Sequence, residues 1–177
     1  HIPGDELALI SDDFLELEAL PESMIFIGAG YIGMEFAHIA TRCGVDVTVV
    51  DVNERILSNF DEDLTLQLQK KSEGLGIKFL FSAEAKAIEK LRKNYRLTVD
   101  HNGKSEELKA ELIFNTAGRV PAVDELDLDK GNVAFTKKGV AVNSFMQSTT
   151  NPIVYACGDV SDTSNLPLTP VAHQEAY

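Results

Sequence analysis

The chain has 177 residues, and its 16 lysine and arginine residues against 28 aspartate and glutamate residues leave a formal net charge of −12 at pH 7. This acidity argues against binding to nucleic acid or to an anionic membrane, because both are recognised by positive charge. The longest charge-free apolar stretch, 23–34, is too short to cross a bilayer. Two cysteines, Cys43 and Cys157, form neither a disulfide scaffold nor a metal-binding pattern, and we expect both to be small buried residues. The composition predicts a soluble cytoplasmic protein.

Residues 1–21 are predicted to be a lead-in segment. The polar run 11–13 has the residue types that begin a short helix, in which Phe14, Leu15 and Leu17 would be the apolar members. A proline at the end of the segment stops this helix.

A compact strand–turn–helix–strand unit follows. The apolar run 24–27 predicts a buried parallel strand, 28–33 a glycine-rich turn, 32–43 a helix, and the valine-rich run 45–50 a second strand. Helical spacing places four side chains on one apolar face: Ile32, Phe36, Ile39 and Ala40. This order is that of a βαβ unit.

A second helix is expected at the acidic run 61–63, because acidic residues suit the positive end of a helix dipole. Its apolar stripe would consist of Leu64, Leu68 and Leu75. The pattern then alternates, which predicts an antiparallel meander with a type I′ turn at 102–103. The expected strands from here onward are 77–81, 85–90, 95–100, 105–109, 111–114, 140–143 and 153–156. The sequence predicts an α/β fold in which a parallel sheet carries a small antiparallel insertion.

The turn 28–33 reads G-x-G-x-x-G, and it follows a strand, opens a helix and precedes a second strand that ends at Asp51. This context is typical of a dinucleotide-binding fingerprint. Gly28 permits the tight turn, Gly30 lets a pyrophosphate approach the backbone, and Gly33 lets the helix press against the strand. The N–H groups at the helix start would hold the phosphates without a lysine. The alternative is a glycine-rich turn in a domain that binds no nucleotide.

Asp51 stands where a ribose-binding acid is expected. Its carboxylate would accept hydrogen bonds from the ribose hydroxyls of NAD and repel the additional phosphate of NADP, so the sequence favours NAD(H) over NADP(H). Arg55, four residues later, could moderate that preference. The alternative for Asp51 is a solvent-facing acid at a strand end.

Five motifs then identify a resemblance. They are GAGYIGME at 28–35, VDVTVVD at 45–51, TAGRVP at 116–121, YACGDV at 155–160 and LTPVA at 168–172. In this order and spacing they resemble the flavin-dependent pyridine nucleotide–disulfide oxidoreductases, which include glutathione reductase and dihydrolipoamide dehydrogenase. The resemblance extends from about Pro21 to Tyr177.

The resemblance implies roles for several residues. The turn 28–33, including Ile32, would bind the nicotinamide cofactor. Tyr31 matches a tyrosine that covers the flavin until the nicotinamide displaces it, and Glu35 matches a glutamate near the flavin and the nicotinamide amide. Without the resemblance, Tyr31 is a packing aromatic residue and Glu35 an acid that satisfies the helix dipole.

The later motifs concern the exit from the NAD domain and the flavin. Gly118 and Arg119 match the stretch where the chain leaves the NAD domain beside the cofactor. Gly158 and Asp159 match the turn whose aspartate binds the flavin ribityl chain, although Asp159 alone is an ordinary turn residue. Thr169 matches the start of a helix directed at the flavin ring.

The departures from the family pattern limit the prediction. The family's first glycine fingerprint, its C-x-x-x-x-C redox pair and its catalytic histidine are absent, and His173 is expected to be a helix surface residue. We therefore expect a middle fragment, inactive alone, with no catalytic residue of its own. Its predicted parts are the lead-in segment 1–21, an NAD(P)-binding domain 22–121 and a returning, incomplete FAD-domain segment 122–177.

The implied function is hydride transfer from NAD(P)H to FAD and on to a small disulfide or thiol substrate, in a protein that is a homodimer when intact and monomeric as this piece. Residues 31–32 and 168–170 look closer to glutathione reductase, which usually takes NADPH, whereas Asp51 favours NADH. The alternatives are dihydrolipoamide dehydrogenase, a flavoprotein that reduces peroxide, oxygen or mercuric ion, a flavin-free Rossmann dehydrogenase, and a non-catalytic nucleotide-binding module.

Overall fold

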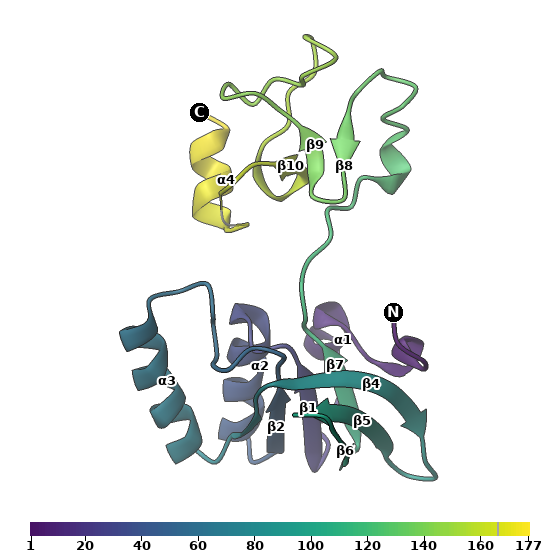
Figure 1. The fold of residues 1–177 in the computed structure, drawn as a ribbon, viewed down its shortest axis with the longest axis vertical. Coiled ribbons are helices and arrows are strands. Elements are labelled where there is room, and N and C mark those ends of the chain that lie inside the picture. Colours follow the sequence, from purple (N-terminus) through teal and green to yellow (C-terminus); the bar gives the residue numbers. More distant parts are fainter. Residues whose placement is uncertain (166) are drawn as a thin grey trace. The chain divides into compact units, whose positions relative to one another are not determined.

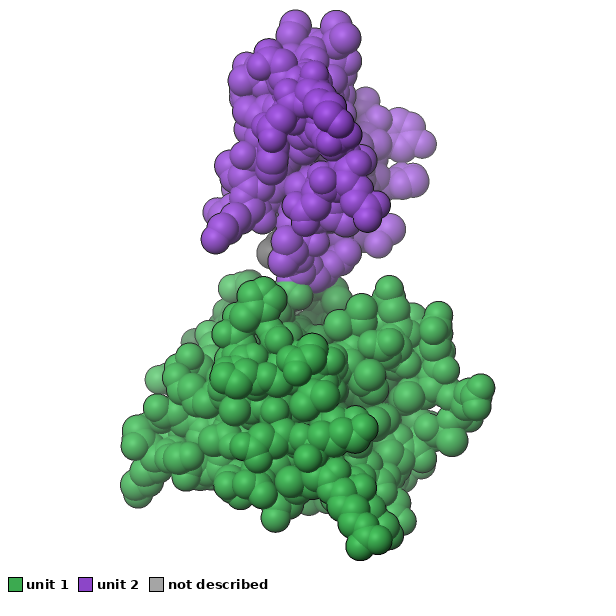
Figure 2. Space-filling view, turned by 90° about the vertical axis from the view of Figure 1, so that its right-hand side faces the viewer, with its two compact units in different colours: residues 1–118 green, residues 119–177 purple. Residues whose placement is uncertain are grey.

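The structure, a computed structural model, describes residues 1–165 and 167–177. The chain divides into two compact units, residues 1–118 (unit 1) and residues 119–177 (unit 2), which Figure 2 colours separately. Each unit has its own helices and strands (Figure 1). Within the described part of the chain, no helix is long and apolar enough to cross a membrane.

Unit 1 is built on a four-stranded parallel sheet in the order β3-β2-β1-β7. Its strands are β1 (Ser23–Ile27), β2 (Asp46–Val50), β3 (Lys78–Leu80) and β7 (Leu112–Asn115). Parallel neighbours need a crossover connection, and helices supply two of them. These are α2 (Tyr31–Arg42) between β1 and β2, and α3 (Glu62–Gly74) between β2 and β3. The predicted α/β fold with a parallel sheet is confirmed.

The parallel sheet is buried on both faces because its strands alternate between two cores. Met24 and Phe26 of β1 pack with the helices, whereas Ile25 and Ile27 belong to the core on the opposite face. Figure 1 shows α2 and α3 on one side of this sheet and β4, β5 and β6 on the other. Successive side chains of a strand point to opposite faces, so a continuous apolar run fills both cores.

The second sheet of unit 1 is an antiparallel meander in the order β4-β5-β6. Its strands are β4 (Ala83–Lys90), β5 (Tyr95–His101) and β6 (Lys104–Ala110). Leu97 and Val99 are fully buried against the parallel sheet. Asn102 and Gly103 have φ values of 55° and 77°, and positive φ at both central residues is what a type I′ turn requires. The predicted meander and its turn are confirmed.

The apolar helix faces agree with the prediction in part. On α2, Phe36 and Ala40 are buried and Ile32 packs against the core as predicted, but Ile39 is 50% exposed. Leu64 of α3 is 67% exposed, and the buried residues of α3 are Thr65 and Ser72. The predicted leucine stripe is therefore wrong except for Leu68, which packs against the core. Both buried hydroxyl groups are hydrogen-bonded, which removes the penalty of burying a polar group.

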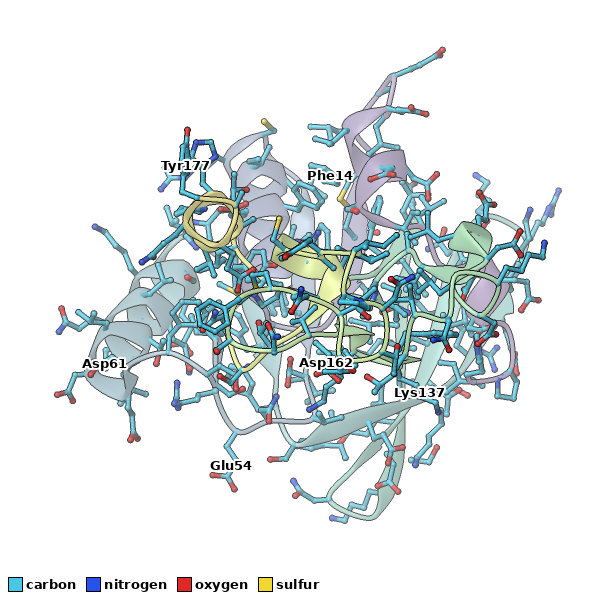
Figure 3. All side chains as sticks on the ribbon, turned by 90° about the horizontal axis from the view of Figure 1, so that it is seen from above. Phe14, Glu54, Asp61, Lys137, Asp162 and Tyr177 are labelled. Atoms are coloured by element: carbon cyan, nitrogen blue, oxygen red, sulfur yellow. The ribbon has the colours of Figure 1, made fainter. Side chains whose placement is uncertain are left out.

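The lead-in segment is built into unit 1. After a short 3-10 helix (Asp5–Leu7), Leu9 pairs with β7 through hydrogen bonds to Ile113 and Asn115 of 2.9 and 2.8 Å. The helix α1 (Ser11–Leu15) buries Phe14, which Figure 3 labels and whose ring stacks on Phe36 at 4.1 Å. Leu17 also packs on the core, but Leu15 is 73% exposed, so its predicted apolar contact is wrong.

Unit 2 has short elements and a small core. Its elements are two 3-10 helices (Asp124–Leu126 and Gly158–Val160), β8 (Phe135–Thr136), β9 (Gly139–Ala141), β10 (Ser161–Asp162) and α4 (Thr169–Glu175). The strands form one sheet in the order β10-β9-β8. The predicted strand 140–143 is shortened to its first half. The predicted strand 153–156 is wrong, because the structure pairs only Tyr155 there, in an isolated bridge to Gln147.

Candidate functional site

The glycine-rich turn between β1 and α2 has two positions that exclude a side chain. Gly28 has φ +105°, and a Cβ atom there would lie 2.7 Å from the backbone of Ala117. A Cβ atom on Gly33 would lie 2.3 Å from the carbonyl oxygen of Gly28 and 2.6 Å from Oγ1 of Thr116. The turn and the close packing of α2 on the sheet therefore both depend on glycine.

Gly30 is different, because open space surrounds the position of its missing Cβ. Its φ of −73° is accessible to any residue, and no heavy atom lies within 4 Å of that position. Gly30 is exposed and is the N-cap residue of α2, to which it brings no side-chain acceptor. The start of α2 thus offers room and backbone donors to an anionic group, which fits the pyrophosphate of a dinucleotide.

The structure brings Asp51 to this turn. Its Oδ2 accepts a hydrogen bond of 2.5 Å from the backbone N–H of Ala29, and its Oδ1 accepts two of 2.7 Å from the backbone and side-chain N–H groups of Asn53. A carboxylate offers about four acceptor positions, so capacity for a further donor remains. Asp51 is half-buried. The carboxylate of Asp51, at the end of β2, is therefore held beside the glycine-rich turn by hydrogen bonds.

The first turn of α2 carries the other predicted residues of unit 1. Ile32 is half-buried and packs against the main core, and Tyr31 is half-buried. Glu35 is exposed. Tyr31 and Glu35 are four residues apart on the helix, so they lie on the same side of α2. Both can face a ligand at the helix start, while Ile32 serves packing.

A hollow of about 480 Å³ lies directly after β2. Glu54, labelled in Figure 3, is one of the residues after β2 that line it, and the first turns of α3 supply the others. The lining residues are Val52, Asn53, Glu54, Arg55, Ser58, Glu62 and Leu66. Most of these side chains are polar or charged, and Val52 and Leu66 are the apolar members.

Thr116 and Asn53 are parts of this site whose roles sequence reasoning missed. The single O–H of Thr116 is shared between the carbonyl oxygens of Ile27 and Gly28, at 3.0 and 2.9 Å, and so ties β7 to the glycine turn. Asn53 orients Asp51. The position of Thr116 inside a recognised motif was a signal for the first role, and the Asp-x-Asn spacing was a signal for the second.

The predicted residues at and after the boundary belong to different units. Gly118, with φ +83°, is the last residue of unit 1. In unit 2, Arg119 Nη2 forms an ion pair of 2.5 Å with Oδ2 of Asp159. A Cβ atom on Gly158 would lie 2.8 Å from that of Ala172, so α4 packs closely on this turn. Arg119, Gly158 and Asp159 thus form one group within unit 2.

Glu175 holds this turn in place and was not predicted. Its Oε2 accepts from the backbone N–H of Gly158, and its Oε1 accepts from the side-chain amide of Asn165, both at 2.7 Å. These hydrogen bonds, that from Asn165 most strongly, hold the pKa of Glu175 below its ordinary value of 4.5. Thr169 is the exposed first residue of α4. No local pattern signals a contact between residues 17 positions apart.

The predictions for the remaining candidate residues are mixed. His173 is exposed, as predicted. Cys43 and Cys157 are both exposed, so their predicted burial is wrong. Cys43 is the C-cap residue of α2, and Cys157 directly precedes the 3-10 helix Gly158–Val160. Among the described residues, no group of three or more His, Cys, Asp or Glu side chains could hold a metal ion.

Comparison with known proteins finds relatives of this chain among flavoprotein oxidoreductases. The chain is 35% identical over 164 residues to a dihydrolipoyl dehydrogenase from Mycobacterium bovis, covering 90% of this chain and 35% of the relative. It is 34% identical over 184 residues to a glutathione reductase from Nostoc sp., covering 97% of this chain and 39% of the relative. The chain thus spans well under half the length of these relatives.

A solved structure shows the same fold. The HOCl-induced flavoprotein disulfide reductase RclA from Escherichia coli, in a Cu(II) complex, superposes with a TM-score of 0.86 at 24% identity, covering 98% of this chain and 39% of that one. The family model described as pyridine nucleotide-disulphide oxidoreductase matches residues 1–176. With the glycine turn and its acid in place, the chain belongs to the pyridine nucleotide-disulphide oxidoreductase family.

Proposed function

We propose that unit 1 is the nicotinamide-nucleotide site of an FAD-dependent disulfide oxidoreductase and that it prefers NAD(H) to NADP(H). The observation that carries this proposal is the hydrogen bond from Ala29 to Asp51, which puts a carboxylate beside the fingerprint turn. The pyrophosphate would lie at the start of α2, where Gly30 leaves open space. The adenosine would occupy the hollow after β2.

The cofactor preference follows from charge. A ribose with free hydroxyls would donate to the acceptor position that remains on Asp51, whereas a 2′-phosphate would be repelled by the carboxylate. Arg55 lines the same hollow, but its guanidinium is hydrogen-bonded to backbone carbonyls of its own loop. NADH is therefore the favoured cofactor.

Unit 2 would serve the flavin in the whole protein. Asp159, released from its ion pair with Arg119, could accept a hydrogen bond from the ribityl chain, and Thr169 would begin the helix directed at the ring. Bound FAD would supply the two-electron chemistry, taking a hydride from the nicotinamide and passing electrons toward a small disulfide or thiol substrate. Tyr31 and Glu35 would position the nicotinamide. The working enzyme would be a homodimer.

Calorimetric titration of the chain with NADH and with NADPH tests the proposal. NADH should bind about tenfold more tightly than NADPH, because a single like-charge contact is worth roughly 1.4 kcal/mol. Asp51→Asn should weaken NADH binding and remove the discrimination, whereas Asp63→Asn, a matched change at an exposed acid, should change neither. Tighter binding of NADPH, unaffected by Asp51→Asn, would contradict the preference.

A non-catalytic nucleotide-binding module is the alternative that the same site allows. That module would bind NADH without reducing a flavin. Anaerobic addition of NADH to the whole protein distinguishes the two: bleaching of a flavin absorption band supports the oxidoreductase, and NADH binding to a protein that holds no FAD supports the module.

A further inference from the structure

Arg55 turns back onto its own loop. It lies four residues after Asp51 and is half-buried. Both terminal nitrogens donate hydrogen bonds to neighbouring acceptors. Nη1 donates to the carbonyl oxygens of Ile56 (3.4 Å) and Leu57 (3.3 Å) and to Oγ1 of Thr65 (2.8 Å). Nη2 donates to the carbonyl oxygens of Ser58 (2.8 Å) and Phe60 (3.2 Å).

These contacts use all the terminal N–H groups of the guanidinium for hydrogen bonds within the protein. The two terminal nitrogens of arginine carry four hydrogens, and here they meet five acceptors. Thr65 is 3% exposed, and its hydroxyl also donates to the carbonyl oxygen of Glu62 at 3.0 Å. Arg55 therefore fastens the loop 56–60 to the first turns of α3.

The loop that Arg55 holds contains an unusual backbone conformation. Leu57 has φ +49°, in the left-handed region that a leucine adopts only at a conformational cost. In this conformation its N–H donates to the carbonyl oxygen of Ala29 at 2.9 Å. The carbonyl oxygen of Leu57 accepts from Arg55 at 3.3 Å and from the N–H of Phe60 at 2.8 Å, so both backbone polar groups of Leu57 are hydrogen-bonded in this conformation.

Ala29 is thus held from both sides within the glycine turn. Asp51 accepts from its N–H, and Leu57 donates to its C=O. Because the peptide group is planar and trans, the direction of the Ala29 carbonyl also sets the direction in which the N–H of Gly30 points. Gly30 is the residue with open space beside it, at the start of α2.

We propose that Arg55 is a positioning residue of the nucleotide site: it braces Leu57 against Ala29 and thereby pre-orders the phosphate-binding turn. This inference rests on the proposed function of unit 1. It assigns Arg55 a role for both NADH and NADPH, since the turn would hold the pyrophosphate that the two cofactors share. An arginine that recognised the 2′-phosphate would instead act on NADPH alone.

The test substitutes Arg55→Gln, with Arg92→Gln at an exposed position of unit 1 as the matched control. Titration of the full chain should show NADH and NADPH each binding about tenfold more weakly to Arg55→Gln, with the ratio of the two affinities unchanged, because pre-organisation of the shared turn is lost. Arg92→Gln should bind both nucleotides as the unsubstituted chain does. A selective loss of NADPH binding, or unchanged affinities, would overturn the proposal.

A second measurement needs no nucleotide. In Arg55→Gln the backbone N–H of Leu57 should exchange with solvent about tenfold faster, because its hydrogen bond to Ala29 is no longer braced. Adding Leu57→Gly to Arg55→Gln should restore part of the NADH affinity, since glycine adopts positive φ without cost. Absence of any restoration, with Leu57 exchange unchanged by Arg55→Gln, would overturn the brace.

Thr65→Val covers the case in which Arg55→Gln does not fold. It keeps the charge of Arg55 and removes one acceptor, so a smaller loss of about threefold is expected for both nucleotides, together with faster exchange at Leu57. If the unsubstituted chain binds neither nucleotide, the proposed function fails. The proposed bracing role of Arg55 is then tested by hydrogen exchange at Leu57 alone. If Thr65→Val leaves the exchange rate of the Leu57 N–H unchanged, that role is contradicted.

Discussion

Unit 1 and unit 2 are each stabilised internally by a different kind of interaction. Unit 1 buries large side chains completely, among them Phe26, Phe114 and Leu97, between a parallel sheet and the layers on its two faces. The buried core of unit 2, among its described residues, consists of Val123, Val133 and Val140. Burial of apolar surface is the main stabilising term in folding, so unit 1 has far more of it.

Unit 2 relies on polar contacts near its surface instead. Side chains that bond its loops and turns include Asn143, Gln147, Ser148, Thr150, Asn151 and Glu175. Each such bond contributes about 1 kcal/mol net. The candidate nucleotide site therefore stands on a packed scaffold, whereas Asp159 and Gly158 stand on a hydrogen-bonded one. Sites of the two kinds should respond differently to substitution and to pH.

The largest expected effect is in the core of unit 1. Phe26→Ala should lower the free energy of unfolding of unit 1 by about 4 kcal/mol, because it leaves a cavity between Phe14 and Phe114. Val140→Ala should cost unit 2 about 2 kcal/mol. Urea titration followed by residue-resolved NMR separates the two units. Equal losses would mean that the cores do not differ as described.

A pair of glycine substitutions separates packing from binding within unit 1. Gly33→Ala should destabilise unit 1 by about 3 kcal/mol, since its methyl group would collide with Gly28 and Thr116. Gly30→Ala has free space and should cost only about 1 kcal/mol, because alanine is a poorer N-cap residue than glycine. Its methyl group would occupy the proposed place of the pyrophosphate, so NADH should bind about tenfold more weakly by calorimetry. Full NADH binding by Gly30→Ala would count against that placement.

Unit 2 should lose stability below about pH 5 through Glu175. Its pKa is lowered in the folded state, so the stability it contributes is present above its ordinary pKa of 4.5 and is lost as the pH falls through the lowered value. Glu175→Gln should cost about 1 kcal/mol at pH 7 and flatten the loss of unit 2 stability between pH 5 and 3. The backbone amide signal of Gly158 reports the change. An unaltered acid profile would show that Glu175 does not hold this turn.

The smallest expected effect concerns a polar contact between α2 and α3. The hydroxyl of Ser72 donates to Leu68 at 2.7 Å, so it accepts from Nε2–H of His38 at 2.8 Å. Burial, and then the charge of Arg42, lower the pKa of His38 below 6.5. Its contribution is present above pH 6.5 and is lost as the pH falls through the lowered pKa.

His38→Gln can still donate to Ser72 but does not titrate. It should therefore change the stability of unit 1 by about 0.5 kcal/mol at pH 7 and remove the decline between pH 7 and 5. Thermal unfolding at several pH values measures this decline. An identical decline in His38→Gln would assign it to other groups.

The amino-acid sequence by itself determined the features that depend on local backbone geometry. Sterics and side-chain alternation act within a few residues, and they account for three features. These are the positive φ at Gly28 and at residues 102–103, the close backbone approach at Gly33, and the burial of strand 24–27 on both faces. The sequence also predicted the βαβ connection, which brings the end of β2 to the turn, although the hydrogen bond from Ala29 to Asp51 joins residues 22 positions apart.

Only the tertiary structure decided which apolar residues are buried and where long polar side chains reach. Leu64 and Ile39 have the spacing of buried residues, yet α3 buries Thr65 and Ser72 rather than Leu64, and Ile39 is exposed although other members of its predicted face are buried. The contacts of Arg55 with Thr65 and of Glu175 with Gly158 join residues 10 and 17 positions apart, so they depend on the path of the backbone between them. Such contacts are set by the packing of whole elements, which no local pattern encodes.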